Sequence, residues 1–194
     1  MTHADARRPL VLDTRELGRR PGSMLEKQRE VEAPDHLGTD VISVPEGQPL
    51  LLDLRLEAVM EGVLVSGSVR ATATGACVRC LEPVDVPVDV DLQELFVYAD
   101  RAAHHHEVDD QDDDADVREL DGELADLEPV IRDTVVPELP FQPVCREDCP
   151  GLCSECGARL ADDPTHHHDQ VDPRWKELDA LRDQLSDPHE QKRN

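Results

Sequence analysis

The amino-acid sequence predicts an α+β fold: an antiparallel β-sheet core with two or three short helices and a Cys-rich, metal-stapled C-terminal segment. Three long runs carry apolar residues at every second position, which is typical of half-buried strands. Shorter runs near the C-terminus carry them three and four positions apart, which is typical of helices. All six cysteines stand in two stretches of the chain, which indicates bound metal.

The first fifty residues carry few strong signals. Residues 1–8 are polar, and we expect them to be disordered. Asp13-Thr14 can cap a short helical turn, because both side chains can accept hydrogen bonds from the N–H groups that follow. Repeated proline and glycine predict that residues 35–49 are mostly loop, with a short strand near Val41–Val44.

The centre of the chain predicts a β-hairpin followed by a third strand. Leucine stands at every second position of residues 50–56, and small or apolar residues do so in residues 63–73. These two runs predict a hairpin that turns at Glu61-Gly62. Alternating valines predict a third strand over residues 84–92. Pro87 cannot donate a ladder hydrogen bond, so this strand is expected to lie at an edge of the sheet or to carry a bulge.

Residues 100–116 interrupt the strand pattern with three histidines and a run of acidic residues. A block of like charge cannot fold on itself, so we expect a solvated, flexible loop. The alternative is a docking strip for a basic partner or a weak metal trap, but nothing in the sequence of the strip fixes a geometry.

Two helices are predicted after this loop. The first is indicated by apolar residues at helical spacing, Leu120, Leu124, Leu127, Ile131 and Val135. Asp126 can cap it, Pro129 suits its first turn, and Pro137 and Pro140 end it. The second begins at Asp172-Pro173 and carries one apolar stripe, expected to pack on the sheet, made of Trp175, Leu178, Leu181 and Leu185. Residues 186–194 are expected to form a disordered tail.

The charge balance limits the classes of partner and compartment. The formal net charge is −24, from 44 acidic and 20 basic side chains. Such an excess repels phosphate backbones and favours basic partners, or simply solubility. The sequence has no run of the roughly 20 apolar residues that span a membrane and no hydrophobic run typical of a secretory signal at its start. We therefore expect a cytoplasmic protein, with reduced cysteines.

The cysteines form two Cys-x2-Cys pairs with two more cysteines between them: Cys77, Cys80, Cys145, Cys149, Cys153 and Cys156. Two intervening residues let both sulfurs reach one tetrahedral ion, while N–H groups of the loop point back at sulfur. Tetrahedral thiolate sites select zinc, with iron–sulfur clusters as the main competitor. Disulfides and a thiol redox pair are the other interpretations, but a thioredoxin-like motif should open a helix, whereas Cys77 follows a strand.

Three arrangements of the ligands are open. The first joins the two Cys-x2-Cys pairs at one ion, and the third uses only the four cysteines after residue 144. The second has two ions, one bound by Cys77, Cys80, Cys145 and Cys149 and the other by Cys153 and Cys156 with His166 or His168. It is favoured because no thiolate is idle, although the histidine run also fits an exposed polar loop. One or two zinc ions follow, structural because four protein ligands leave no open position.

Four motifs together resemble the bacterial YceD family, over roughly residues 10–185. They are Cys77-x2-Cys80-Leu81-x-Pro83, Leu139-Pro140-x2-Pro143-x-Cys145, Cys149-x-Gly151-Leu152-Cys153-x2-Cys156-Gly157-x2-Leu160 and Asp172-Pro173-Arg174-Trp175. The segment Leu17-Gly18-x2-Pro21-Gly22-Ser23 resembles actinobacterial members. The resemblance implies a single YceD-like domain over residues 9–185, with residues 145–168 as its Cys/His metal-binding segment.

One departure from the family concerns the second ion. Many members carry a further Cys-x-Cys after the C-terminal knuckle, whereas this chain has His166-x-His168. Imidazole can replace thiolate at zinc, so mixed ligands are expected here.

The resemblance implies a non-enzymatic factor for large ribosomal subunit biogenesis, associated with accumulation of large-subunit rRNA. The family is often encoded beside a small zinc-binding ribosomal protein, so a basic ribosomal protein or a pre-ribosomal particle is the expected partner, and no small-molecule substrate is implied. Direct RNA contact would fall to a few basic residues such as Arg70 and Arg79. The alternatives are a thiol redox or rRNA-processing enzyme, or a zinc-stabilised interaction module unrelated to ribosomes.

Overall fold

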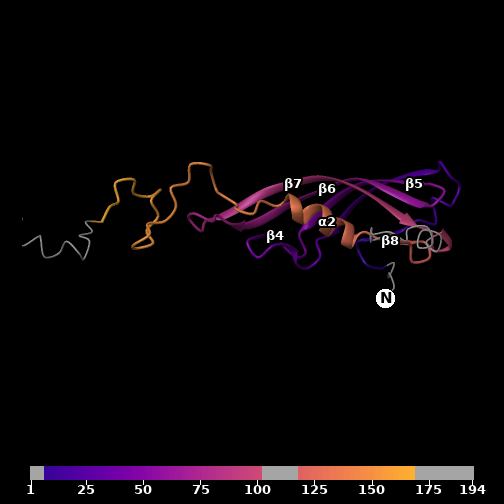
Figure 1. Ribbon diagram of the computed structural model, residues 1–194, viewed down its shortest axis with the longest axis horizontal. Helices are drawn as coiled ribbons and strands as arrows, with labels where there is room; N and C mark the ends of the chain where they lie inside the picture. The colour runs from indigo at the N-terminus through magenta and orange to yellow at the C-terminus, as the bar shows by residue number, and fades with distance from the viewer. Residues whose placement is uncertain (1–6, 102–117, 169–194) are drawn as a thin grey trace, which may run out of the picture. The chain divides into compact units, whose positions relative to one another are not determined.

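Strands dominate the described part of the chain. The computed structural model describes residues 7–101 and 118–168, and it divides into two compact units, Met1–Cys149 and Pro150–Asn194 (Figure 1). The expected domain over residues 9–185 spans both units. Most of the loop predicted at 100–116, the helix after Asp172 and the tail 186–194 lie outside the described residues, whereas residues 100 and 101 are described and are helical. Among the described residues, no helix is long and apolar enough to cross a membrane.

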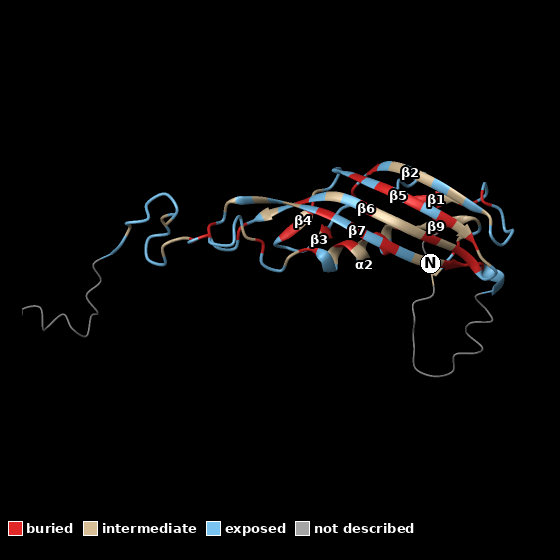
Figure 2. Ribbon diagram, turned by 90° about the horizontal axis from the view of Figure 1, so that it is seen from above, coloured by how far each residue is buried: buried red, intermediate tan, exposed pale blue. Residues whose placement is uncertain are grey.

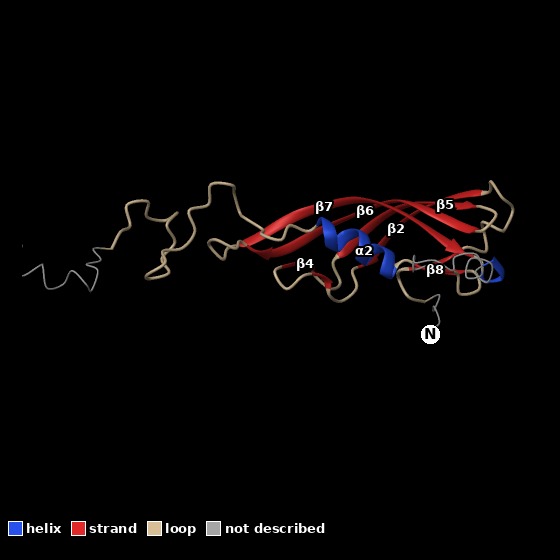
Figure 3. Cartoon of the chain, viewed as in Figure 1, coloured by secondary structure: helices blue, strands red, loops and turns tan. Residues whose placement is uncertain are grey.

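The elements of the first unit are mostly strands (Figure 3). They are β1 (Val11–Asp13), β2 (Met24–Glu32), β3 (Leu37–Gly38), β4 (Ile42–Val44), β5 (Pro49–Ala58), β6 (Gly62–Ala76), β7 (Pro83–Val97), β8 (Arg118–Glu119), β9 (Leu124–Asp126) and α2 (Glu128–Glu138). The sheet-dominated core and the short strand β4 are as predicted. The sequence predicted an α+β fold, but the described part of the chain has far more strand than helix.

The predicted hairpin is confirmed and forms the middle of a seven-stranded sheet. β5 and β6 pair antiparallel, with Leu54 opposite Gly67. β7 pairs with β6 along its whole length, from Val97 to Pro83, and β2 pairs with the other side of β5. Beyond the end of β5, β4 takes its place beside β6, and β3 follows.

β7 lies at an edge of the sheet at Pro87, as predicted. Pro87 stands opposite Thr72 of β6. On the other side of β7, the described residues supply only β8, which pairs with Phe96 and Val97. The missing N–H of the proline therefore costs no ladder hydrogen bond.

The core lies on one face of the sheet. Alternate residues of β5, β6 and β7 are buried there, and the stripes of buried and exposed positions are visible along these strands (Figure 2). The ribbon of β1 and β9 and the helix α2 supply the opposing side chains, among them Leu12, Ala125 and Ile131. The period of two follows from strand geometry, in which successive side chains point to opposite faces.

The first predicted helix is shorter than expected, and its N-terminal part is wrong. Leu120 follows β8 and Leu124 begins β9, with a turn between them at Gly122, where φ is +67°. Leu120 lies in the core, whereas in β9 the buried residue is Ala125 and Leu124 is only half-buried, so the helical spacing is a coincidence of separate elements. The helix begins at Glu128, whose N–H donates to the Asp126 carboxylate, and Pro129 lies in its first turn as predicted.

Strand β2 was not predicted, because its inner positions are partly charged. On its inner side, Lys27 and Arg29 lie between Leu25 and Val31. The long aliphatic stems of Lys27 and Arg29 can lie against apolar neighbours. Their charged ends donate to the carbonyl oxygens of Asp13 and Val11 in β1. A pattern that counts only apolar residues therefore misses an amphipathic edge strand.

Candidate metal centres

The first unit brings four cysteines together, which we call centre 1: Cys77, Cys80, Cys145 and Cys149. Their four Sγ atoms lie within 4.8 Å of one another. The Sγ atoms of Cys77 and Cys149 are 3.9 Å apart, and those of Cys80 and Cys145 are 3.7 Å apart. Cys77 and Cys149 are 72 residues apart in sequence, and Cys80 and Cys145 are 65 residues apart. Centre 1 therefore joins distant parts of the chain.

The sulfur separations fit a tetrahedral zinc ion. A Zn–S bond of about 2.3 Å places neighbouring thiolates of a tetrahedron about 3.8 Å apart. The two shortest separations in centre 1 lie on either side of this value. The side chains therefore converge at the right spacing for zinc.

A tight turn positions the first two cysteines at the end of the β6–β7 hairpin. The N–H of Leu81 donates to the carbonyl of Cys77 at 2.8 Å, and the N–H of Cys77 donates to the carbonyl of Glu82 at 2.7 Å. This closure needs a positive φ after the second cysteine, and Leu81 has φ of +63° although it is not glycine. Only one other described non-glycine residue, His36, has a positive φ.

The segment after α2 is tied to this turn by main-chain contacts. The N–H of Val78 donates to the carbonyl of Pro143 at 2.9 Å. The Arg79 guanidinium donates to the carbonyls of Glu147 and Cys149 at 2.9 and 3.1 Å. These contacts place Cys145 and Cys149 beside the hairpin. Arg79 thus has a positioning role that its sequence pattern did not reveal.

The second unit holds a second cluster, centre 2, made of Cys153, Cys156, His166 and His168. The Cys156 Sγ lies 3.2 Å from the Nε2 atoms of both histidines, which are 2.9 Å apart. For zinc, bond lengths of about 2.3 Å to sulfur and 2.0 Å to nitrogen give edges of roughly 3.3 to 3.5 Å, so centre 2 is slightly contracted but has the required shape. His167 is not part of it, since its Nδ1 faces the Thr165 carbonyl at 3.1 Å.

The two centres are built on the same backbone turn. In the second, the N–H of Gly157 donates to the carbonyl of Cys153 at 2.9 Å, and the N–H of Cys153 donates to the carbonyl of Ala158 at 2.7 Å. Gly157 has φ of +72°, which matches the position of Leu81 in the first turn. This repetition is independent evidence that both turns serve the same chemistry.

Main-chain N–H groups stabilise a thiolate in each turn. The pKa of Cys77 is lowered to about 6, mainly by the N–H of Cys145 and also by those of Cys80 and Arg79. The pKa of Cys153 is lowered to about 6 by the N–H groups of Cys156 and Glu155. In contrast, the pKa of Cys145 is raised to about 12, because the neighbouring Cys149 thiol and burial oppose a second negative charge. A cation among the sulfurs would remove that repulsion.

The centres differ in exposure. Cys77, Cys80 and Cys149 are buried and Cys145 is exposed. In centre 2, Cys153 and His166 are half-buried and the other two donors are exposed. A thiol that takes part in redox exchange must be accessible, so the complete burial of Cys77 argues against such a role in centre 1.

The structure groups the eight donors as in the second arrangement considered from the sequence. Cys145 and Cys149 lie with the first Cys-x2-Cys pair, and His166 and His168 lie with the second. What the sequence could not decide was whether Cys149 groups with Cys145 or with Cys153, because it stands four residues from each of them.

A family model described as "Large ribosomal RNA subunit accumulation protein YceD" matches residues 65–182. The match includes all eight candidate donors, most of β6 and all of β7. No solved structure matches the chain significantly.

Several proteins of similar sequence carry names that assign no activity. The chain is 48% identical to uncharacterized protein Rv2926c of Mycobacterium tuberculosis over 170 residues, which cover 88% of this chain and 80% of that protein. It is 44% identical to uncharacterized protein ML1660 of Mycobacterium leprae over 170 residues, 88% of this chain and 76% of that protein. Uncharacterized protein YlbN of Bacillus subtilis is 29% identical over 112 residues, 54% of this chain and 58% of that protein.

Proposed function

This chain belongs to the YceD family, and from that premise we propose that it is a non-enzymatic, cytoplasmic factor for large ribosomal subunit biogenesis. It promotes accumulation of large-subunit rRNA by binding a basic ribosomal protein or a pre-ribosomal particle. The observation that carries the proposal is the family match over residues 65–182, whose description names large ribosomal RNA subunit accumulation.

The proposal includes two structural zinc ions. One is bound by the four thiolates of centre 1 and the other by the two thiolates and two imidazoles of centre 2. Bound zinc supplies a closed tetrahedral crosslink and, with four protein donors, offers no position for a substrate. The sulfur separations and the repeated turn support this assignment.

The role of centre 1 follows from the segments that it joins. It links the end of the β6–β7 hairpin to residues 145–149, which follow α2. Closing a loop of this length removes conformational entropy from the unfolded chain, so metal binding stabilises the fold. A binding factor of this kind needs a rigid surface and no reactive group, which agrees with the burial of Cys77, Cys80 and Cys149.

Depletion of the protein in its native host tests the function. We expect the ratio of mature large-subunit to small-subunit rRNA to fall, with precursor species accumulating, when both are measured on total RNA. Expression of the wild-type chain should restore the ratio. A variant with Cys77→Ser and Cys80→Ser should restore it less, in proportion to the folded protein that remains.

The outcome that contradicts the function is an unchanged rRNA ratio and an unchanged subunit profile in fully depleted cells. As a control, a substitution at an exposed residue that belongs to neither centre, Glu46→Gln, should restore the ratio as the wild type does.

A further inference from the structure

One face of the sheet is covered by no element that the structure describes. The buried side chains of β5, β6 and β7 point towards β1, β9 and α2 and form the core. The alternate side chains on the opposite, outer face are exposed or half-exposed on all four long strands, except at the end where Gly62 pairs with Val97 (Figure 2). This outer face is therefore accessible over most of the length of β6.

The outer face is strongly acidic. The pairing register places eight carboxylates on it, from Glu26, Glu30, Glu32, Asp53, Glu57, Asp85, Asp89 and Asp91, and two guanidinium groups, from Arg55 and Arg70. Arg55 pairs with Glu57 at 3.2 Å. Within the described part of the chain, seven of the carboxylates have no ion-pair partner: Glu26, Glu30, Glu32, Asp53, Asp85, Asp89 and Asp91.

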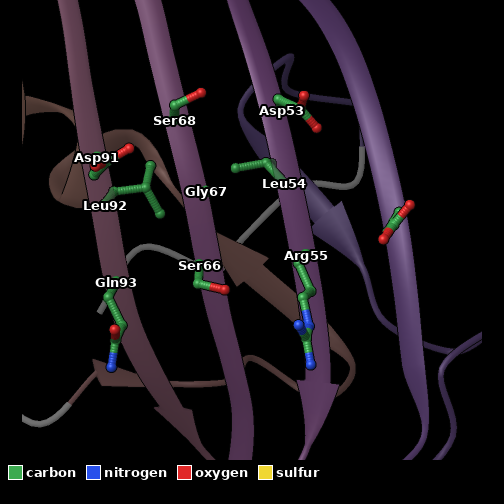
Figure 4. Close-up of a pocket in the computed structure, with 10 residues that line it drawn as sticks. Asp53, Leu54, Arg55, Ser66, Gly67, Ser68, Asp91, Leu92 and Gln93 are labelled. Atoms are coloured by element: carbon green, nitrogen blue, oxygen red, sulfur yellow. The ribbon is translucent and has the colours of Figure 1, made fainter.

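The shape of the face is a shallow trough along β6. The outward residues of this strand are small, namely Ser66, Ser68, Thr72 and Thr74, apart from Leu64 and Arg70. A hollow of about 450 Å³ lies around Gly67, between Asp53 and Arg55 of β5 and Asp91 and Gln93 of β7 (Figure 4). Gly67 is required there, since a Cβ atom would lie 2.0 Å from the Asp53 carbonyl oxygen.

We propose that the outer face of the sheet is the docking surface for a basic, extended polypeptide segment that lies along β6. Its Lys and Arg side chains reach the carboxylates of β2 and β5 on one side and those of β7 on the other. The proposal rests on the proposed function, because it assigns the surface through which a ribosome-assembly factor holds its basic partner.

The spacing of the carboxylates suits an extended chain. β2 and β7 are separated by three strand intervals, which is roughly 14 Å, and outward side chains repeat about every 6.8 Å along a strand. An extended segment has the same repeat and presents side chains alternately to both sides. A single metal ion fits less well, since the clusters of described donors close enough to hold one contain none of these carboxylates. Nucleic acid is repelled by the same charges.

A direct binding assay tests the proposal. The probe is a fluorescein-labelled decapeptide of alternating Arg and Ser, titrated with zinc-loaded full-length protein and followed by fluorescence anisotropy. The test variant carries Glu26→Gln, Glu30→Gln, Asp89→Asn and Asp91→Asn. The matched control carries Asp40→Asn, Glu46→Gln, Glu61→Gln and Glu138→Gln, which removes the same charge from exposed positions off the outer face.

We expect the outer-face variant to bind about tenfold more weakly than the wild type, and the control to bind within about twofold of it. Equal losses in both variants would show that net charge alone attracts the peptide and would overturn the proposal. Tighter binding of a labelled ten-nucleotide single-stranded RNA to the outer face would also overturn it. Thermal melting checks folding, and the outer-face variant should melt no lower than the wild type, because it relieves repulsion between carboxylates on one face.

Expression of the outer-face variant in depleted cells separates the two proposals. If depletion lowers large-subunit rRNA and this variant restores it fully, the docking surface is wrong and the proposed function stands. If depletion leaves the rRNA unchanged, the proposed function is wrong, while the peptide assay still decides the docking surface.

Discussion

Cys77 and Cys153 are the cysteines whose protons compete least with zinc at neutral pH. Main-chain N–H groups lower the pKa of each to about 6: mainly that of Cys145, outside the turn, for Cys77, and those of Cys156 and Glu155 for Cys153. Each is therefore mostly thiolate at neutral pH, the form that binds zinc. The backbone thus prepares one donor in each centre before the metal arrives.

Acidification should release zinc from both centres. As the pH falls through about 6, protons occupy the sulfurs of Cys77 and Cys153, so zinc affinity falls. We expect zinc retained after dialysis to decrease between about pH 7.5 and about pH 5, as measured by elemental analysis. Zinc that stays fully bound throughout this range would contradict the assignment of these thiolates as ligands.

Leu81 is strained because the turn requires a left-handed backbone. Its φ of +63° is unfavourable for a residue with a Cβ atom, and 66% of its surface is exposed. Leu81→Gly should raise the free energy of unfolding by roughly 0.5 to 1 kcal/mol, as measured by denaturant titration. Val78→Gly, in the same turn but without a positive φ, should lower it. Destabilisation by both substitutions would show that the Leu81 side chain makes a contact that outweighs its strain.

The β5–β6 pair is the element that depends most on one glycine. At Gly67 a Cβ atom would lie 2.0 Å from the Asp53 carbonyl oxygen and 2.9 Å from the Leu54 Cα atom, so the two strands would have to separate. Gly67→Ala should therefore destabilise the protein by about 2 to 4 kcal/mol in thermal or denaturant unfolding. The neighbouring Ser66→Ala should change stability by less than about 0.5 kcal/mol. Equal stability of the two variants would contradict this register.

The strands and the helix show how well the spacing of apolar residues predicts secondary structure. Strands β5, β6 and β7 alternate strictly, and the sequence located all three. Leu120, Leu124 and Leu127 have helical spacing by coincidence, because a turn at Gly122 separates the first two and Leu124 belongs to β9, where Ala125 is the residue buried in the core. β9 exists only through its partner, over 100 residues away in sequence, so local propensity could not indicate it.

On the scale of the whole molecule, the two units depend on metal to different degrees. The first unit has an extensive apolar core, whereas residues 150–168 contribute none of the buried apolar side chains among the described residues. Chelation should therefore unfold the second unit locally and leave the sheet folded. Hydrogen exchange after treatment with a strong chelator would show loss of protection in residues 150–168 first. Simultaneous loss of protection in β5 and β6 would contradict this view.

The centres should also load independently. Wild-type protein should bind two zinc ions per chain, and Cys80→Ser or Cys156→Ser should each reduce the content towards one. Cys80→Ser should also lower the stability of the sheet, because centre 1 joins the β6–β7 hairpin to the segment after α2. Mass spectrometry under native conditions measures the zinc content. A content of one ion in the wild type, or two in Cys156→Ser, would contradict two separate four-ligand sites.

The sequence by itself determined the hairpin, the third strand with its edge proline, the eight candidate donors and the family, because each is written in local spacing. Only the tertiary structure decided which donors meet. Centre 1 depends on where the chain after α2 returns to the sheet, through contacts such as those of Val78 and Arg79 with Pro143 and Glu147. The acidic outer face likewise depends on the register of strand pairing, which aligns carboxylates from separate strands. Centre 1 and the outer face both depend on contacts between residues far apart in sequence, and such contacts have no local signature in the chain.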